Sequence, residues 1–241
     1  MQLTPIQFVT GLFSLLLALI SIYVGLYIAS RYRKYNNKIL LYVGLGWIGL
    51  MNGWWPSAIN FVLVVATGTA MSEVPFFIIG NVFIPFFLFI WMIGVTELLY
   101  KEKQKYILIF FLIFAVIFDG LIFYYLTTDP SKMGQLQGPV DVKYTGLYAL
   151  FLITLLIIVA ISGVLFARES LKSEQNESKL RGIFILYAFL SWVIGSILDA
   201  SVDLNFATLP IIRIILITSN LASYIGFIIP KFIKKIFLKQ E

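Results

Sequence analysis

The sequence predicts an all-α integral membrane protein, a bundle of seven transmembrane helices with its N-terminus outside and its C-terminus in the cytoplasm. Three observations carry this prediction: the composition, seven long apolar runs, and basic residues gathered in alternate connections. The chain has 241 residues, of which 60% are hydrophobic and 12% charged. Soluble domains average about 45–50% apolar and about 25% charged residues. The composition therefore indicates a protein whose surroundings are mostly lipid.

The apolar runs have the length that a membrane-spanning helix requires, roughly 20 residues for a hydrocarbon core about 30 Å thick. They are residues 6–30, 39–68, 75–99, 106–126, 146–167, 182–201 and 209–230. Barrel strands would alternate over about 10 residues, whereas these runs are continuous and about twice as long. We therefore expect helices, with residues 1–230 forming the transmembrane domain and residues 231–241 a separate tail.

The second run is irregular, because its 30 residues are too many for one straight span. Pro56 follows Trp54 and Trp55, and a proline kinks or ends a helix. We predict one span to about Trp55, followed by a kinked extension or a half-buried segment on the outer side.

The distribution of basic residues predicts the orientation. Fifteen of the 18 basic residues fall on one side if the N-terminus is outside: they lie at 31–38, 101–105, 168–181 and 231–239. Cytoplasmic connections carry an excess of Lys and Arg, so this side is predicted to be the cytoplasm of a multi-pass protein of the cell membrane. The net charge of +6 is then a topology signal, and we expect no nucleic-acid partner.

The connections and the tail give further expectations. Residues 127–145 contain two Gly and two Pro and are expected to form an irregular outer loop. Residues 168–181 are expected to extend the fifth and sixth helices. The tail places Phe232, Ile233, Ile236 and Phe237 on one helical face and lysines, Lys239 included, largely on the other. This pattern is typical of an amphipathic helix on membrane lipids; docking of a cytoplasmic partner is the alternative.

Missing residue types argue against catalysis. The chain has no Cys and no His, which excludes thiolate nucleophiles, His-ligated metals and an imidazole base. Paired intramembrane catalytic aspartates and GxSxG are absent too, so we predict no enzyme, no metal and no cofactor. The seventh run has no Lys, and Lys231 lies beyond its inner end, so covalent retinal is not expected either.

Polar residues within the apolar runs are the candidate site, because each ionisable group in a membrane is costly unless it is paired or hydrated. A helical rise of about 1.5 Å per residue places five of them at one depth in the outer third. They are Asn52, Asn81, Asp119, Asp199 and Arg213. In one interpretation these residues only pair across helices; in the other they line an outward pocket for a small ligand. We expect Arg213 to pair with Asp199 or Asp119, and favour Asp199 because consecutive helices usually pack together.

Two segments of the second half resemble uncharacterised seven-span membrane proteins of archaea. They are ESKLRGIFILYAFLSWVIGSILDA and RIILITSNLASYIGFIIPKFIKKIF, within roughly the last 65 residues. The general layout also resembles the membrane-sensor region of seven-span histidine kinases. That resemblance implies a sensor role, which would need a separate cytoplasmic partner because this chain has no kinase domain. It assigns no ligand and no functional residue.

The sequence thus favours a receptor-like or sensor membrane module. It would bind a small extracellular or membrane-borne ligand and signal to a separate cytoplasmic partner. The alternative is a transporter or channel for a small solute, an ion or a lipid. Transport needs a polar path through the membrane, and the inner halves of the runs offer little beyond Ser, Thr and Asn220.

Overall fold

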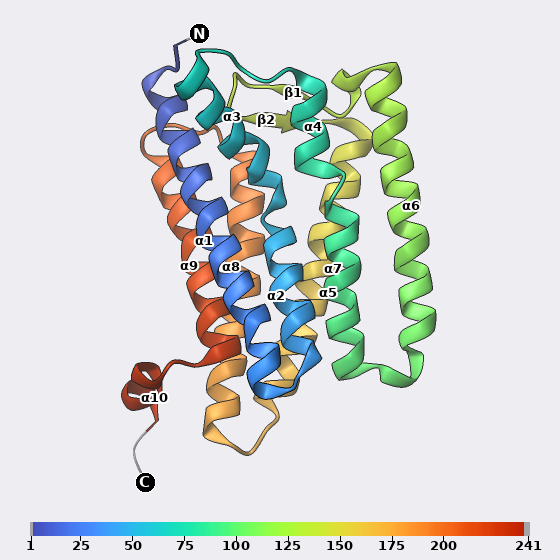
Figure 1. Cartoon of the computed structure of the whole chain (residues 1–241), viewed down its shortest axis with the longest axis vertical. Coiled ribbons are helices and arrows are strands. Elements are labelled where there is room, and N and C mark those ends of the chain that lie inside the picture. The colour runs from blue at the N-terminus through green and yellow to red at the C-terminus, as the bar shows by residue number, and fades with distance from the viewer. Residues whose placement is uncertain (1, 239–241) are drawn as a thin grey trace.

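The computed structural model describes residues 2–238 and is 83% helical, with seven helical segments long and apolar enough to cross a membrane. This confirms the seven-helix bundle (Figure 1). The helices are α1 (Pro5–Tyr35), α2 (Lys38–Leu50), α3 (Trp55–Thr67), α4 (Glu73–Asn81), α5 (Ile84–Leu99), α6 (Gln104–Thr128), α7 (Gly146–Leu171), α8 (Asn176–Ser201), α9 (Thr208–Ile228) and α10 (Lys231–Phe237).

The two ends of the bundle differ. The first, which we call the hairpin end, carries the N-terminus, α3, α4 and a small β-hairpin (Figure 1). The second, the tail end, carries α10 and the connections α1–α2, α5–α6 and α7–α8. Helix α7 continues to Leu171, and α8 begins at Asn176. The expected extensions of the fifth and sixth spans are therefore confirmed.

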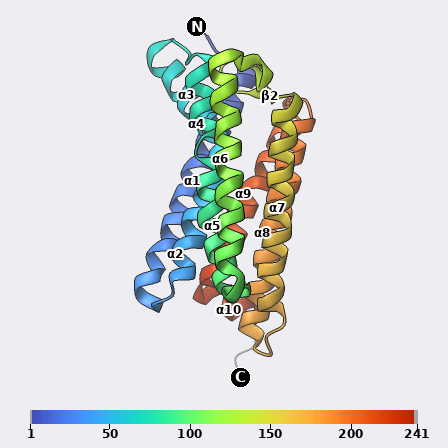
Figure 2. The ribbon, with the colours of Figure 1, turned by 90° about the vertical axis from the view of Figure 1, so that its right-hand side faces the viewer.

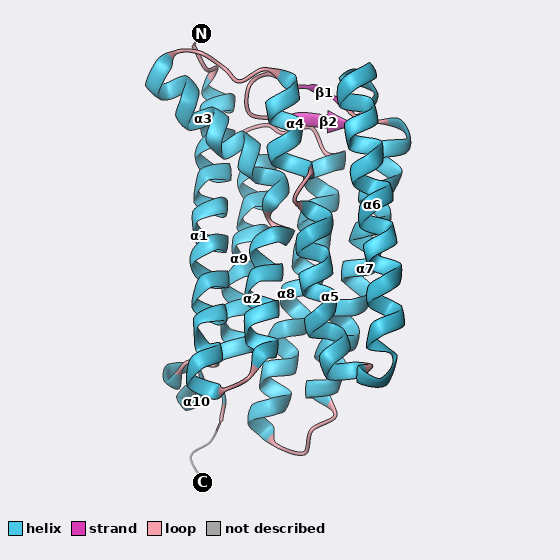
Figure 3. Cartoon of the chain, turned by 45° about the vertical axis from the view of Figure 1, so that its right-hand side comes forward, coloured by secondary structure: helices cyan, strands magenta, loops and turns pink. Residues whose placement is uncertain are grey.

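The second and third spans are both interrupted near the hairpin end, where Figure 3 shows a break in each. Between α2 and α3 the chain forms the short 3₁₀ segment η1 (Asn52–Trp54) before Pro56. The predicted kink is thereby confirmed. Between α4 and α5 it breaks at Val82 and Phe83, before Pro85, a break that we did not predict. Each proline stands in the first turn of the helix that follows, where its missing N–H leaves no helical hydrogen bond unmade.

Residues 129–145 are not the irregular loop that we expected. After the 3₁₀ turn η3 (Pro130–Lys132) they form an antiparallel hairpin of β1 (Gly134–Leu136) and β2 (Val142–Tyr144), with Gln135 opposite Lys143. Gly138 has a φ of +90°, which only glycine adopts readily, and it reverses the chain between the strands. Of the Gly and Pro residues that suggested a loop, Gly138 and Pro139 lie in the turn of the hairpin, Gly134 begins β1 and Pro130 begins η3.

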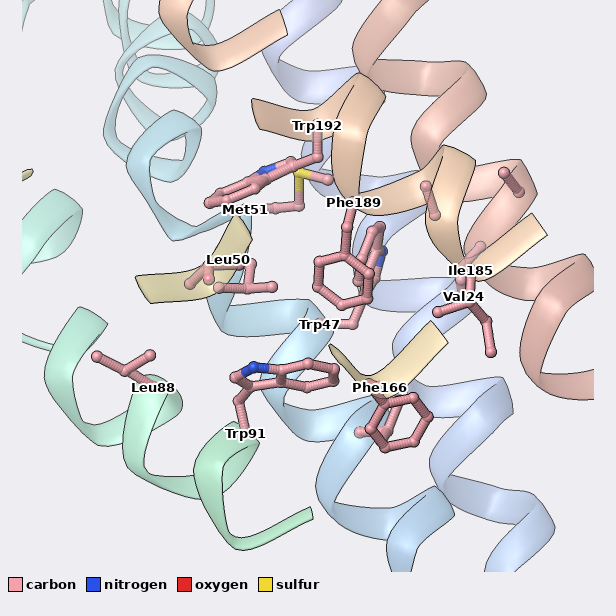
Figure 4. Close-up of a cluster of buried hydrophobic side chains, with 14 of the residues drawn as sticks. Val24, Trp47, Leu50, Met51, Leu88, Trp91, Phe166, Ile185, Phe189 and Trp192 are labelled. Atoms are coloured by element: carbon pink, nitrogen blue, oxygen red, sulfur yellow. The ribbon is translucent and has the colours of Figure 1, made fainter. Parts of the chain in front are cut away.

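The main core is built on aromatic side chains. Trp47 and Trp91 are fully buried, and the Phe189 ring packs on both, with ring centroids 5.4 and 4.9 Å away (Figure 4). Phe166 packs on Trp91 at 5.6 Å. The Trp47 indole donates to Asn220 over 2.9 Å, and the Trp91 indole to Ser162 over 2.9 Å. These bonds satisfy the indoles inside the bundle and tie α2 to α9 and α5 to α7.

Helix α6 lies at the edge of the bundle (Figures 1 and 2). Only 17% of the apolar 18-residue stretch within the span Lys101–Thr128 is buried, against 61% of the corresponding stretch within Lys38–Thr67. Most of its side chains therefore face the surroundings, which are lipid in a membrane.

Helix α10 forms as predicted for the tail. Phe232, Ile236 and Phe237 are exposed, Ile233 is buried, and the Lys234 ammonium pairs with Glu177 of α8 over 2.5 Å. Lys239 lies outside the described residues.

Candidate ligand cavity

A cavity of about 170 Å³ lies inside the hairpin-end half of the bundle. Its wall draws on α2, η1, α3, α4, α5, α7, α8, α9 and the hairpin. The polar lining residues are Ser57, Asn81, Asp141, Tyr144, Ser196, Asp199 and Arg213; the tryptophans are Trp54 and Trp192; the aliphatic ones include Leu50, Ile84, Leu88, Leu152, Leu155 and Leu156. A polar group and an apolar group of a ligand could thus both be accommodated.

The two helix interruptions create part of this wall. Gly53 and Trp54 come from the break between α2 and α3, and Asn81 and Ile84 flank the break between α4 and α5. Asn52 connects the breaks, because its amide donates to the carbonyl of Ile79 over 2.9 Å. Irregular backbone at membrane depth is tolerated where it is buried in protein or lines a cavity, and both conditions hold here.

Arg213 and Asp199 form the predicted intramembrane pair. The Arg213 guanidinium donates to Asp199 Oδ2 over 3.0 Å, and the Trp54 indole donates to the same oxygen over 2.7 Å. Arg213 is only 2% exposed, while the Asp199 side chain is 17% exposed. A guanidinium this deeply buried needs such a partner, since an unpaired charge would be strongly destabilising.

The hairpin adds a second carboxylate, from Asp141, that sequence reasoning missed. Burial, together with the negative charge of Asp199, raises the pKa of Asp141 to about 6, against a partial opposing effect of Arg213. Its Oδ1 accepts from the backbone N–H of Val142 over 2.8 Å. Three charged side chains therefore act on one another in the cavity wall, two of them acidic.

Tyr144 is the other hairpin residue of the wall that sequence reasoning missed. Its hydroxyl lies beside the Asn81 side chain, and burial raises the pKa of Tyr144 to about 12, so the phenol stays protonated at neutral pH. Asp141 and Tyr144 lie in a connection that the sequence predicted to be an irregular loop, and the folding of the hairpin brings them to the cavity.

Several buried polar atoms of the wall have no hydrogen-bond partner within residues 2–238. They are Asn81 Oδ1, Asp199 Oδ1, Arg213 Nε, Trp192 Nε1 and the Tyr144 hydroxyl. Buried polar groups in proteins are nearly always hydrogen-bonded to protein or to ordered water. Five orphaned groups around one cavity indicate that it holds water or a polar ligand.

The predicted polar layer is thus only partly brought together. Asn81, Asp199 and Arg213 line the cavity. Asn52 is not a lining residue, but its amide donates to the Ile79 carbonyl, two residues before Asn81 in α4. Asp119 does not belong to it: it is half-buried on α6, and neither lines the cavity nor pairs with Arg213. Asp119 was predicted to belong to the layer from helical rise, but α6 lies at the edge of the bundle. Depth alone does not say towards which neighbour a residue points.

The cavity is closed on its tail-end side by the rings of Trp47, Trp91, Phe166 and Phe189, which we call the aromatic layer. Trp91 lies three residues beyond Leu88 along α5, and Trp47 two residues before Gly49 along α2. Both steps lead away from the hairpin end. A molecule in the cavity therefore meets packed aromatic rings, not a polar path, in this direction (Figure 4).

Within the described part of the chain, no three carboxylates gather in a group that could hold a metal ion. No protein-family model matches this chain, and no curated protein matches it in sequence. An assignment of function must therefore start from the geometry of the cavity.

Proposed function

We propose that this protein is a receptor-type membrane module. Its cavity would bind a small molecule from the outer solution or the outer leaflet, and the bundle would pass the binding event to a cytoplasmic partner. The observation that carries the proposal is the set of buried, unpartnered polar atoms around a preformed cavity. A structural ion pair alone would need neither the space nor the free donors and acceptors.

The orientation belongs to the proposal. The basic clusters at 31–38, 101–105, 168–181 and 231–235 all lie in the tail-end turns of the spanning helices, in the connections between them or in α10. By the positive-inside rule this end would face the cytoplasm, and the hairpin end with its cavity would face outward. The proposed sensor role also agrees with the layout of the membrane-sensor region of seven-span histidine kinases.

Helix α9 supplies a route from cavity to cytoplasm. Arg213 stands near its hairpin end, and α10 follows its tail end after only Ile229 and Pro230. The Glu177 carboxylate of α8 pairs with Lys234 of α10 and with Arg181 over 2.8 Å. Because Asp199 and Glu177 both belong to α8, a shift of α9 against α8 at the cavity would strain the contact that holds α10. A partner that binds the basic, amphipathic α10 would sense this shift.

The aromatic layer supports binding over passage, since transport would require these buried rings to separate. The transporter alternative predicts a different result: proteoliposomes with the purified protein would show solute or ion flux above empty vesicles. Sustained flux of this kind would argue against the receptor assignment.

The proposed function is tested with a variant whose new side chain fills part of the cavity. A Cβ added at Gly53 would meet no described atom within 4 Å, so Gly53→Leu should place its side chain in the cavity without a clash. Gly120 on α6 is equally unobstructed but exposed and remote from the cavity, which makes Gly120→Leu the matched control. Thermal unfolding of the purified protein is measured with a library of small polar and amphipathic molecules.

We expect at least one compound to raise the unfolding temperature of the wild type and of Gly120→Leu, but not of Gly53→Leu. If no compound stabilises the wild type, or if stabilisation survives in Gly53→Leu, the cavity is not a binding site and the proposal fails.

A further inference from the structure

The charge balance of the cavity points to the class of ligand. Arg213 is the one cation among its lining residues, and its charge is matched by Asp199 at 3.0 Å. Asp141 adds a second carboxylate with no cation of its own. When both carboxylates are ionised, the wall carries one net negative charge in a setting of low dielectric. A bound cation would neutralise it, whereas a bound anion would add to the repulsion.

The free acceptors suit one kind of cation in particular. Asn81 Oδ1 and Asp199 Oδ1 are buried without a partner, and the Asp141 carboxylate lies in the same wall. Asn81 itself is 1% exposed, so bulk solvent does not satisfy its free oxygen. A primary ammonium has three N–H donors and no acceptor, as in the lysine side chain. A metal ion is a poorer match, because within residues 2–238 no three carboxylates gather in a group that could hold one.

The size and the remaining lining set the rest of the ligand. At about 170 Å³ the cavity is slightly larger than an engineered cavity of about 150 Å³ that holds benzene. Leu88, Leu155 and Trp192 offer apolar surface beside the carboxylates. A ligand of roughly 6–10 non-hydrogen atoms, with one charged end and a short apolar body, matches these dimensions.

We propose, on the basis of the proposed function, that the cavity binds a small primary amine as its ammonium ion. The charged nitrogen lies between Asp141 and Asp199, with Asn81 as the third acceptor, and the apolar body packs against Leu88, Leu155 and Trp192. The ligand thereby joins the hairpin, which carries Asp141, to α8 and α9 of the bundle. Binding would draw the hairpin and these two helices together.

The test compares three molecules of one shape and different charge: hexylammonium, hexanoate and 1-hexanol. Thermal unfolding and equilibrium binding are measured at pH 7.5 with purified full-length protein. Hexylammonium should stabilise the wild type most, and Gly53→Leu should abolish its effect. In Asp141→Asn we expect its affinity to fall at least about tenfold, as for the loss of one charge from a buried pair.

Asp203→Asn is the matched control, because it removes an exposed carboxylate four residues after Asp199 that does not line the cavity. It should leave the affinity for hexylammonium unchanged, which separates a contact in the cavity from a general effect of net charge. Affinity in the wild type should also fall below pH 6, as Asp141 takes up a proton. The charged groups that face it are Asp199 on α8 and Arg213 on α9, with the neutral Tyr144 phenol of its own hairpin beside them.

Two results would overturn the assignment: hexanoate or hexanol binding as tightly as hexylammonium, or equal affinities in Asp141→Asn and Asp203→Asn. If hexanoate or 1-hexanol binds the wild type at least as tightly as hexylammonium but does not bind Gly53→Leu, the ammonium proposal fails while the cavity remains a binding site. If neither these probes nor the library stabilises the wild type, both proposals fail.

Discussion

At the scale of single residues, the cavity wall contains one ion pair, Arg213 with Asp199, and one further carboxylate, Asp141, whose pKa is raised. Arg213 and Asp199 compensate each other at 3.0 Å, and Trp54 adds a hydrogen bond to the carboxylate. Asp141 forms no ion pair of its own within the described residues, and burial and the nearby charge of Asp199 disfavour its ionised form more than Val142 and Arg213 favour it. The two aspartates should therefore respond differently to mutation.

For the pair, we expect Arg213→Met to lower the free energy of unfolding by about 3–5 kcal/mol, since it leaves the buried carboxylate of Asp199 without its cation. Asp199→Asn should lower it by less, since Asp141 remains as a second carboxylate that acts on Arg213. The double variant should lose clearly less than the sum of the two. The exposed pair of Lys172 and Glu169 is the control, and Lys172→Met should cost less than about 1 kcal/mol. Unfolding in detergent measures all four variants, and additive losses in the double variant would show that the two groups are not coupled.

For Asp141, we expect a substitution to increase stability at neutral pH, and not to lower it. Its pKa is about 6 in the folded state and near 3.8 in an unfolded chain, so the folded state holds the proton more tightly. The contribution of Asp141 to the free energy of unfolding is therefore greatest below about pH 4, falls as the pH rises to about 6 and stays low above that pH. Asp141→Asn should raise the unfolding temperature at pH 8 but change it little at pH 4, with at most about 3 kcal/mol involved. An equal effect at both pH values would contradict the buried carboxylate.

At the scale of elements, the interruptions of the second and third spans share a cause but differ in how readily sequence reveals them. Residues 39–68 are too long for one helix, so Pro56 was an obvious place for a break. Residues 75–99 have the right length for one uninterrupted span, so the length gave no reason to predict a break near Pro85. The structure breaks both helices a few residues before the proline.

The hydrogen bond between the breaks gives the third prediction. Asn52→Ala removes the donor to the Ile79 carbonyl and leaves this acceptor buried at the interruption. We expect a loss of about 1–2 kcal/mol and faster hydrogen exchange of the amides at 80–84. Asn205→Ala, in an exposed turn between α8 and α9, is the control and should leave exchange at 80–84 unchanged. Unaltered exchange in Asn52→Ala would show that the two breaks are independent.

The fourth prediction concerns α10. Glu177 is the carboxylate that pairs with both Lys234 and Arg181, so Glu177→Gln should release α10 from α8. Brief trypsin treatment should then cleave after Lys234 or Lys235 faster than in the wild type, whereas Glu169→Gln, which alters an exposed pair, should not change the rate. Equal cleavage in both variants would mean that the ion pair does not hold α10 in place.

At the scale of the whole molecule, the seven-helix bundle could be predicted from the sequence, because the length of an apolar run has a single simple cause in a membrane. The orientation, which rests on charge placement, stays a prediction. The cavity needed more. Arg213 and Asp199 could be paired because their spans are consecutive, but Asp119 was placed by depth alone and proved to lie on the edge helix. Asp141 could not be anticipated at all, since its place in the wall depends on the hairpin folding over the end of the bundle.

Central to the receptor assignment, we propose that the cavity faces the outer solution and that the aromatic layer separates it from the cytoplasm. The chain has no native Cys, so single-cysteine variants carry no background labelling. Gly53→Cys places a thiol in the cavity, and Ser162→Cys places one against Trp91 in the aromatic layer. Both are treated in intact cells with a membrane-impermeant methanethiosulfonate that carries a trimethylammonium group. We predict rapid labelling of Gly53→Cys and none of Ser162→Cys; labelling of Gly53→Cys only after the membrane is permeabilised would contradict the account.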